Sequence, residues 1–330
     1  MQQRQSTGEL TRRHMLALAG GLGMAQCFAA HGAPAPEVSR DTTRIMTRPI
    51  PSTGEPLPVV GLGTAQQWND DLPATHAAFT EVVRTLANGG GRVVDTASNP
   101  GGYGIAEGIL GEIFTETDLR PRIFIATKVE EQLFLNVGAL QAALQRLRVS
   151  KIDLMQLHSV SWSWQNLGPL RDWKAQGLVR YIGITKDSSN LNFDTVESIM
   201  RRWKPDFLQI DCSMTNREAE KRVLPAAAEL GVATLINEPF GGVRRGGAPS
   251  RHNLFHAAQG KPLPDWASEF DTATWGQFFL KYLLGNPAVT AVIPGTDKAA
   301  HMADNLGAGR GRLPNAAQRQ RMVQFIEELA

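Results

Sequence analysis

The sequence predicts a single α/β domain of the (β/α)8 class, the TIM barrel. From residue 59 onward, short apolar runs alternate with longer stretches at helical spacing, and this alternation indicates repeated βα units. The apolar runs number eight, which is the number of strands in such a barrel. Length alone is indecisive, because 330 residues suit either one barrel or two average domains.

The eight predicted strands share their short apolar character. They span residues 59–62, 92–95, 123–126, 153–157, 179–183, 207–210, 232–236 and 289–293. The helix-like segments between them include residues 75–87, 139–147, 218–230 and 275–284. Each strand can therefore return parallel to the preceding one through a right-handed crossover.

A doubly wound nucleotide-binding fold is the alternative for this pattern. Such a fold carries Gly-x-Gly-x-x-Gly after its first strand, where a helix begins. The glycine run at residues 89–91 precedes a strand instead of following one, and the run at residues 20–23 lies in the N-terminal leader. Neither run therefore fits this motif. The one long connection, at about residues 238–272, is rich in Gly, Pro and Arg, and loops of this length are usually functional.

Residues 1–36 are predicted to be an export signal with a short linker. Arg12 and Arg13 precede a Gly- and Ala-rich apolar run of about 15 residues and then small residues, which resembles a twin-arginine (Tat) signal. The Tat machinery would carry the protein, already folded in the cytoplasm, to the periplasm or otherwise out of the cell. The apolar run is shorter than the roughly 20 residues that a membrane-spanning helix needs, so cleavage of the leader is favoured over anchoring. No stable span is then expected in the mature part, residues 37–330. An N-terminal anchor and lipidation at Cys27 are the alternatives.

Charge and cysteine content are consistent with a folded, exported domain. Lys and Arg exceed Asp and Glu by two, with several arginines in the leader, so no nucleic-acid partner is expected. Of the two cysteines, Cys27 would leave with the leader and Cys212 would remain alone. No internal disulfide is then expected, which suits folding in the reducing cytoplasm. Cys212 is interpreted as a packed small residue rather than a nucleophile.

Four polar residues follow the second, third and fourth predicted strands: Asp95, Tyr103, Lys128 and His158. In a barrel all four converge on the face formed by the carboxyl ends of the strands. Each alone could be a helix cap, a solvated charge, a packed ring or a loop aromatic. Together, at three successive strand ends, they favour a catalytic set.

Around these residues the chain resembles the aldo-keto reductase family, over most of its length after residue 57. The segments that carry the resemblance are residues 61–64, 92–97, 103–111, 125–128, 144–147 and 151–159. The resemblance implies an oxidoreductase that uses a nicotinamide cofactor to interconvert small carbonyl compounds, aldehydes or ketones, and alcohols.

The chemistry explains these residue types. Hydride delivered to a carbonyl carbon leaves an alkoxide, which needs a proton and a hydrogen-bond donor. The resemblance makes Tyr103 the proton donor and His158 the group that orients the carbonyl. Lys128 would favour the ionised phenol, and Asp95 would hold the lysine in place.

The resemblance also implies an extended dinucleotide across the barrel mouth, with NADP(H) favoured and NAD(H) as the alternative. The residues expected to hold it are Gly63, Thr64, Thr185, Lys186, Gln209, Asn237, Pro239, Phe240, Gly295, Thr296, Lys298, His301, Asp304 and Asn305. Gln209 would hold the nicotinamide carboxamide. Lys298 and His301 would contact the adenine-side phosphate at the start of a helix, where backbone amides bind anions.

Some positions depart from the family pattern. Thr185 and Lys186 stand where Ser-Asn is common, and Asn237 stands where a tyrosine stacks on the nicotinamide. The connection from Asp95 to Tyr103 is also longer than usual. These departures leave a second hypothesis open, an exported non-catalytic binding protein on the same barrel. A barrel hydrolase is not favoured, because no paired carboxylates or metal-ligand cluster is evident.

The substrate pocket is predicted from large aromatic residues on active-face loops. The candidates for its walls are Trp68, Trp162, Trp164 and Trp266, since pockets for apolar carbonyls are lined mainly by such side chains. Core packing is the equal alternative for each. His252 and His256 lie four residues apart without accompanying carboxylates, so no metal is expected.

Overall fold

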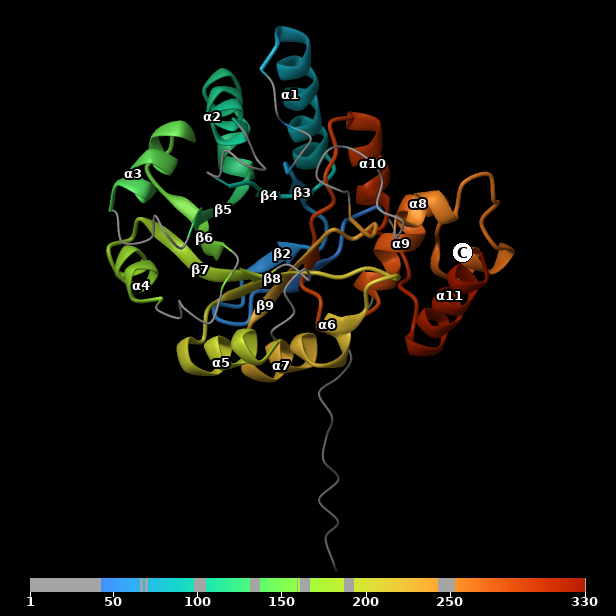
Figure 1. Ribbon diagram of the computed structural model, residues 1–330. Coiled ribbons are helices and arrows are strands. Elements are labelled where there is room, and N and C mark those ends of the chain that lie inside the picture. Colours follow the sequence, from blue (N-terminus) through green and yellow to red (C-terminus); the bar gives the residue numbers. More distant parts are fainter. Residues whose placement is uncertain are drawn as a thin grey trace, which may run out of the picture. The chain divides into compact units, whose positions relative to one another are not determined.

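Eight parallel strands form one sheet in which neighbours follow chain order (Figure 1). They are β3 (Leu62–Gly63), β4 (Val93–Asp95), β5 (Phe124–Glu130), β6 (Ile152–His158), β7 (Val179–Lys186), β8 (Phe207–Asp211), β9 (Ala233–Asn237) and β10 (Ala291–Val292). Each corresponds to one predicted strand, and the predicted (β/α)8 class is confirmed. The computed structural model describes residues 43–65, 68, 71–97, 105–130, 137–158, 160, 167–186, 193–242 and 253–329.

The first and last strands of this sheet meet. Val60 forms a parallel bridge with Val292, and Gly63 forms one with Gly295. The Gly61 N–H donates to the Val292 carbonyl over 2.8 Å. The eight strands therefore form a ring, and we call the junction of β3 with β10 the seam.

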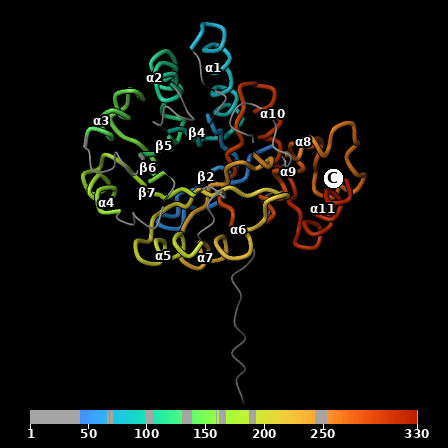
Figure 2. Tube along the Cα trace, in the orientation of Figure 1, coloured from blue at the N-terminus to red at the C-terminus, as the bar shows by residue number. Residues whose placement is uncertain are grey.

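Helices surround the ring in chain order (Figures 1 and 2). They are α1 (Pro73–Asn88), α2 (Ala106–Glu116), α3 (Val137–Arg146), α4 (Gly168–Ala175), α5 (Phe193–Trp203), α6 (Glu218–Lys221), α7 (Val223–Leu230), α9 (Trp275–Leu284) and α10 (Ala299–Gly307). The predicted helix at residues 218–230 is divided at Arg222 into α6 and α7. α10 returns beside α1, where Gly89 leaves room for the side chain of Leu306.

Several elements outside the repeating units were not predicted. An antiparallel hairpin of β1 (Thr47–Pro49) and β2 (Pro56–Pro58) precedes the barrel, and α11 (Ala316–Leu329) ends it. The predicted long connection contains α8 (Leu254–Ala257) and the short 3-10 helix Asp265–Phe270. Strands of three residues with proline at their ends give no periodic signal, which explains why the hairpin was missed.

Alternate residues of each strand face opposite sides of the ring. Phe124 and Tyr181 belong to an inner apolar cluster, with their rings 5.8 Å apart. The next residues, Ile125 and Ile182, belong to the larger cluster between strands and helices. This period of two decides which polar side chains can meet inside the barrel.

The predicted signal and linker, residues 1–36, lie outside the described residues. In the part of the chain that the structure does describe, no helix combines the length and apolar character needed to cross a membrane.

The close approach of Gly61 to β4 gives a test of the packing. A Cβ on Gly61 would lie 2.8 Å from both the Cβ and the carbonyl oxygen of Val93. We expect Gly61→Ala to lower the free energy of unfolding by about 1–3 kcal/mol, because the backbone must shift to relieve the overlap. Urea unfolding measures this change.

Gly108→Ala in α2 is the matched control, because a Cβ there meets nothing within 4 Å. Alanine is favoured over glycine in a helix by about 1 kcal/mol, so this variant should be at least as stable as the parent. Equal losses in both variants would contradict the close approach of Gly61 to Val93.

Candidate active site

The polar residues predicted at the strand ends lie where the carboxyl ends of the strands meet. Asp95 ends β4, Lys128 lies near the end of β5, and His158 ends β6 as a partly buried residue. Asp95 and Lys128 are each only 2% exposed. Tyr103, the fourth predicted catalytic residue, lies outside the described residues.

A buried ion pair joins two of these residues. The Lys128 Nζ donates to Asp95 Oδ2 over 2.6 Å and to the Thr96 carbonyl over 2.9 Å. Strand register brings the pair together, because Asp95 lies opposite Ala126 and Lys128 follows two residues later on the same face of β5. Buried charges need such compensation, since removal from water costs several kcal/mol per ion.

Two glutamine side chains complete the surroundings of the carboxylate. Gln156 on β6 donates through Nε2 to Asp95 Oδ1 over 3.3 Å, and Gln209 on β8 donates to Asp95 Oδ2 over 3.1 Å. Gln156 also donates to Gln209 Oε1 over 2.9 Å. We call Asp95, Lys128, Gln156 and Gln209 the polar layer. It lies inside the ring, on the strand face that also carries the inner apolar cluster.

A cavity of about 210 Å³ opens beside the polar layer. Its lining residues come from the carboxyl ends of β3, β4, β8 and β9 and from the segments after β9 and β10: Gly63, Ala65, Asp95, Gln209, Asn237, Glu238, Pro239, Phe240, Gly242, Asn253, Phe255, Ile293 and Gly295. Six of these were predicted to bind the cofactor: Gly63, Gln209, Asn237, Pro239, Phe240 and Gly295. The cavity therefore gathers predicted residues that are far apart in the sequence.

The cavity fits the nicotinamide end of a dinucleotide. Asn237 Oδ1 is buried and has no hydrogen-bond partner among the described residues, so a ligand amide could donate to it. The ring of Phe240 lies 4.9 Å from that of Phe255, and both line the cavity. Amide groups beside an aromatic wall are complementary to a nicotinamide ring with its carboxamide.

The other predicted cofactor residues do not line this cavity. Thr64, Thr185, Lys186, Thr296 and Asn305 are buried, whereas Lys298 and His301 are exposed at the start of α10. The Asp304 carboxylate accepts hydrogen bonds from Thr274 and Gln277 and thereby ties α10 to α9. Among these residues, Lys298 and His301 best suit a phosphate group, because they are exposed at the N-terminus of a helix.

Of the tryptophans predicted as pocket walls, the two that the structure describes, Trp68 and Trp266, do not line this cavity. Trp68 has no exposed surface, stacks on Phe79 at 4.3 Å and donates to the Thr296 carbonyl, so it is a core residue and cannot touch a substrate. Trp266 packs against Phe278 and Phe325, with ring centroids 5.7 Å apart in each case. Trp162 and Trp164 lie outside the described residues.

Glu107, near the start of α2, is a site-supporting residue that sequence reasoning missed. It is 1% exposed and accepts hydrogen bonds from Thr127 over 2.5 Å and from Arg146 over 2.7 Å. Burial raises the pKa of its carboxyl, and these donors oppose the rise. Glu107 anchors α2 to β5 beside Lys128, and its only sequence signal was its place four residues after Tyr103.

Glu238 was also missed. It lines the cavity and has a φ of 48°, a left-handed conformation that is uncommon for a residue with a side chain. Strained backbone of this kind clusters at functional sites. The cavity therefore contains a carboxylate that the resemblance did not imply.

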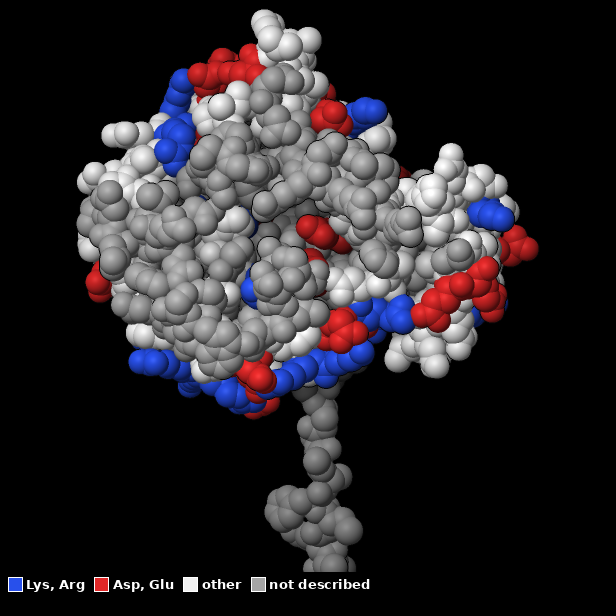
Figure 3. All heavy atoms as spheres, in the orientation of Figure 1, with Lys and Arg blue, Asp and Glu red and all other residues white. Residues whose placement is uncertain are grey.

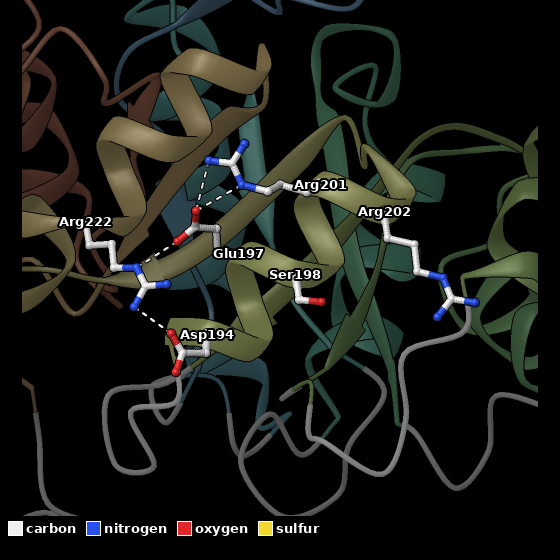
Figure 4. Close-up of a pocket in the computed structure, with 6 residues that line it drawn as sticks. All are labelled: Asp194, Glu197, Ser198, Arg201, Arg202 and Arg222. Atoms are coloured by element: carbon white, nitrogen blue, oxygen red, sulfur yellow. Dashed lines mark hydrogen bonds and ion pairs between the residues drawn. The ribbon is translucent and has the colours of Figure 1, made fainter.

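A second pocket is lined by residues of α5 and by Arg222, and most of its charged side chains form ion pairs with one another. Glu197 bonds both Arg201 and Arg222, and Arg222 also contacts Asp194 over 2.6 Å (Figure 4). Arg202 points away from these pairs (Figure 4). Basic and acidic groups gather along this edge of the molecule (Figure 3), where exposed pairs contribute little stability.

Among the residues that the structure describes, one group has the composition of a metal site: Asp71, His76 and Glu112, with ligand atoms within 4.8 Å of one another. The His76 ring contacts Asp71 over 3.0 Å and Glu116 over 3.1 Å. The hydrogen bond to Asp71 raises the pKa of His76. His76 on α1 thus contacts Asp71 before that helix and Glu116 on α2, whereas Glu112 pairs with Arg148.

Cys212 is fully buried, as predicted for a packed residue. Burial raises the pKa of its thiol, so the side chain stays protonated and is a poor nucleophile.

The ion pair of the polar layer can be tested through stability alone. Asp95→Asn leaves the Lys128 ammonium buried without its counter-ion, so we expect a loss of about 3–5 kcal/mol in the free energy of unfolding. Asp95→Asn combined with Lys128→Met should cost less, because no unpaired charge remains. Urea unfolding compares the two.

Glu81→Gln serves as the control, because the Glu81–Arg84 pair is about half exposed. Its removal should change stability by less than about 1 kcal/mol. If the double variant lost as much as the single Asp95 variant, the ion pair would not be the source of the effect.

The family model described as "Aldo/keto reductase family" matches residues 59–320. Aldo-keto reductase yakc of Schizosaccharomyces pombe, whose name carries NADP(+), is 24% identical over 301 residues, covering 80% of this chain and 87% of its own. The 6-dehydroglucose reductase of Novosphingobium aromaticivorans is 27% identical over 257 residues, with 71% and 81% covered.

Solved structures share the fold. An aldo-keto reductase from Klebsiella pneumoniae in complex with NADPH matches with a TM-score of 0.68 at 19% identity, covering 86% of this chain and 95% of that one. The holo form of a Bacillus halodurans aldo-keto reductase matches with a TM-score of 0.67 at 20% identity, covering 86% and 96%. The family match over most of the barrel, together with the buried Asp95–Lys128 pair beside the cavity, shows that the chain belongs to the aldo-keto reductase family of oxidoreductases.

Proposed function

We propose that this chain reduces aldehydes or ketones to alcohols, and catalyses the reverse reaction, with NADP(H) as its cofactor. The observation that carries the proposal is the buried Asp95–Lys128 pair beside a cavity at the carboxyl ends of the strands. The NADPH complex of the Klebsiella pneumoniae protein and the name of the Schizosaccharomyces pombe relative favour NADP(H) over NAD(H).

The cofactor would supply the hydride in reduction and accept it in oxidation. Gln209 and Asn237 would bind its carboxamide, and Phe240 would lie against its ring, since all three line the cavity. Lys298 and His301, exposed at the start of α10, would contact the adenine-side phosphate.

Proton transfer would fall to Tyr103. In reduction, the carbonyl carbon gains a hydride while the phenol of Tyr103 donates its proton to the carbonyl oxygen. The Lys128 ammonium, held by Asp95 over 2.6 Å, stabilises the phenolate that remains. His158, partly buried at the end of β6, donates a hydrogen bond that orients the carbonyl oxygen.

Tyr103→Phe tests this assignment against the non-catalytic alternative. We expect the rate of aldehyde reduction to fall about 10²–10⁴-fold, the usual range for a lost general acid, with NADPH still bound. Cofactor fluorescence measures binding, and NADPH oxidation with an aldehyde panel measures turnover.

Tyr181→Phe is the control, because its hydroxyl bonds Thr53 and Glu55 beside the hairpin, away from the cavity. It should leave turnover unchanged. A parent protein that binds NADPH without reducing any aldehyde or ketone would favour the binding-protein hypothesis instead.

Export after folding forms the second part of the proposal. Arg12 and Arg13 precede the apolar run of the leader, and Cys212 is a buried free thiol that needs no oxidising compartment. The Tat machinery moves folded proteins, so the cofactor could be bound before transport.

Arg12→Lys with Arg13→Lys should keep the full-length protein in the cytoplasm, because the paired guanidinium groups are the feature that the leader shares with Tat signals. Cell fractionation and immunoblotting report the distribution. Arg4→Lys, elsewhere in the leader, is the control and should be exported normally. Export of the double variant at the normal level would argue against this route.

A further inference from the structure

Gln156 occupies the centre of the polar layer. Its position on β6 lies between Lys128 on β5 and Gly183 on β7. A Cβ on Gly183 would come within 2.9 Å of the Gln156 Cγ. The glycine therefore lets the Gln156 side chain pass across β7 and reach Gln209 on β8, two strands away.

The hydrogen bonds of the layer fix the orientation of both amides. A carboxylate only accepts hydrogen bonds, so both glutamines must present their NH₂ groups to Asp95. Turning the Gln156 amide over would place its oxygen against two acceptors, Asp95 Oδ1 and Gln209 Oε1. In the observed orientation Gln156 Oε1 has no hydrogen-bond partner among the described residues. The Gln156 amide is therefore oriented by the hydrogen bonds that its NH₂ group donates to Asp95 and Gln209, although its own oxygen accepts none.

Gln209 is left with a defined set of free groups. One N–H is directed to Asp95, and Oε1 already accepts from Gln156. One N–H and one acceptor position of Oε1 remain, and Gln209 lines the cavity. A primary carboxamide, which offers one acceptor and a donor NH₂, is complementary to this pair.

We infer that Gln156 is a positioning residue, which holds the Gln209 amide in the orientation that recognises the cofactor carboxamide and links that amide to the Asp95–Lys128 pair. This inference rests on the proposed function. Gln156 has no exposed surface and is not among the residues that line the cavity. It therefore acts through Gln209 and Asp95 rather than by touching the ligand.

Without Gln156, the Gln209 oxygen loses its internal donor. The Gln209 amide would keep its N–H contact with Asp95 but could rotate about it, so that Oε1 is no longer held toward the ligand. Selectivity for a carboxamide over a group without the NH₂ should fall, while contacts at the adenine end should not change.

The experiment compares the dissociation constants of NADP⁺ and its 3-acetylpyridine analogue, in which a methyl group replaces the carboxamide NH₂. For the parent protein we expect NADP⁺ to bind about fivefold to tenfold more tightly, which is the value of one hydrogen bond. For Gln156→Met this ratio should fall to about one. Binding of 2′-phospho-ADP-ribose, which lacks the nicotinamide, should be unchanged.

Two further variants complete the test. Gln318→Met makes the same replacement on α11, where the Gln318 amide bonds Glu269 at the surface, and should keep the ratio of the parent. Gln156→Leu replaces Gln156→Met if thermal unfolding shows that the methionine variant is not folded.

The outcomes distinguish the role of Gln156 from the proposed function of the chain. An unchanged ratio in the Gln156 variant, or a ratio of one in the parent protein, overturns the role of Gln156 and leaves the reductase proposal standing. A parent protein that binds neither dinucleotide overturns the proposed function and this inference together. Only loss of selectivity with retained binding of 2′-phospho-ADP-ribose supports it.

Discussion

The arrangement of the barrel mouth depends on the charge of one buried carboxylate. Asp95 is 2% exposed, and a carboxylate removed from water to this extent must be surrounded by donors. Lys128, Gln156 and Gln209 provide them from three other strands. The requirement to satisfy Asp95 thus determines the direction of every other side chain in the polar layer.

Glycines make this layer sterically possible. The ring interior cannot hold large side chains at every position of every strand, and Gly183 leaves the space that Gln156 occupies. At the seam, a Cβ on Gly63 would lie 2.8 Å from the Ile293 carbonyl oxygen. The absence of a Cβ at Gly183 and Gly63 is therefore as necessary to the arrangement of the site as its polar side chains.

Sequence reasoning found the parts of the fold and site that produce local patterns. Apolar runs predicted all eight strands of the ring, and polar residues at the predicted strand ends led to Asp95 and Lys128, which a hydrogen bond joins in the structure. The role of His158 stays a prediction. Gln156 was missed because its role comes from strand register, which brings Gly183 and Gln209 to it across β7 and β8. Trp68 was misplaced because a loop position after a strand does not reveal whether a side chain turns inward. The role of Tyr103 remains a prediction, since that residue lies outside the described part of the chain.

The seam has a consequence for the cost of opening the ring. β3 and β10 comprise only two residues each, yet they join the beginning and the end of the barrel. Gly63, Ile293 and Gly295 from this junction line the same cavity as Gln209 and Asn237. A ligand that filled the cavity would contact both sides of the junction. Separating the two sides would then also release the ligand, so the free energy of opening would rise with ligand concentration. The junction between the two shortest strands of the ring is thus the one that a bound ligand would stabilise. Exchange of the Gly61 amide hydrogen with solvent should therefore slow as the cavity fills.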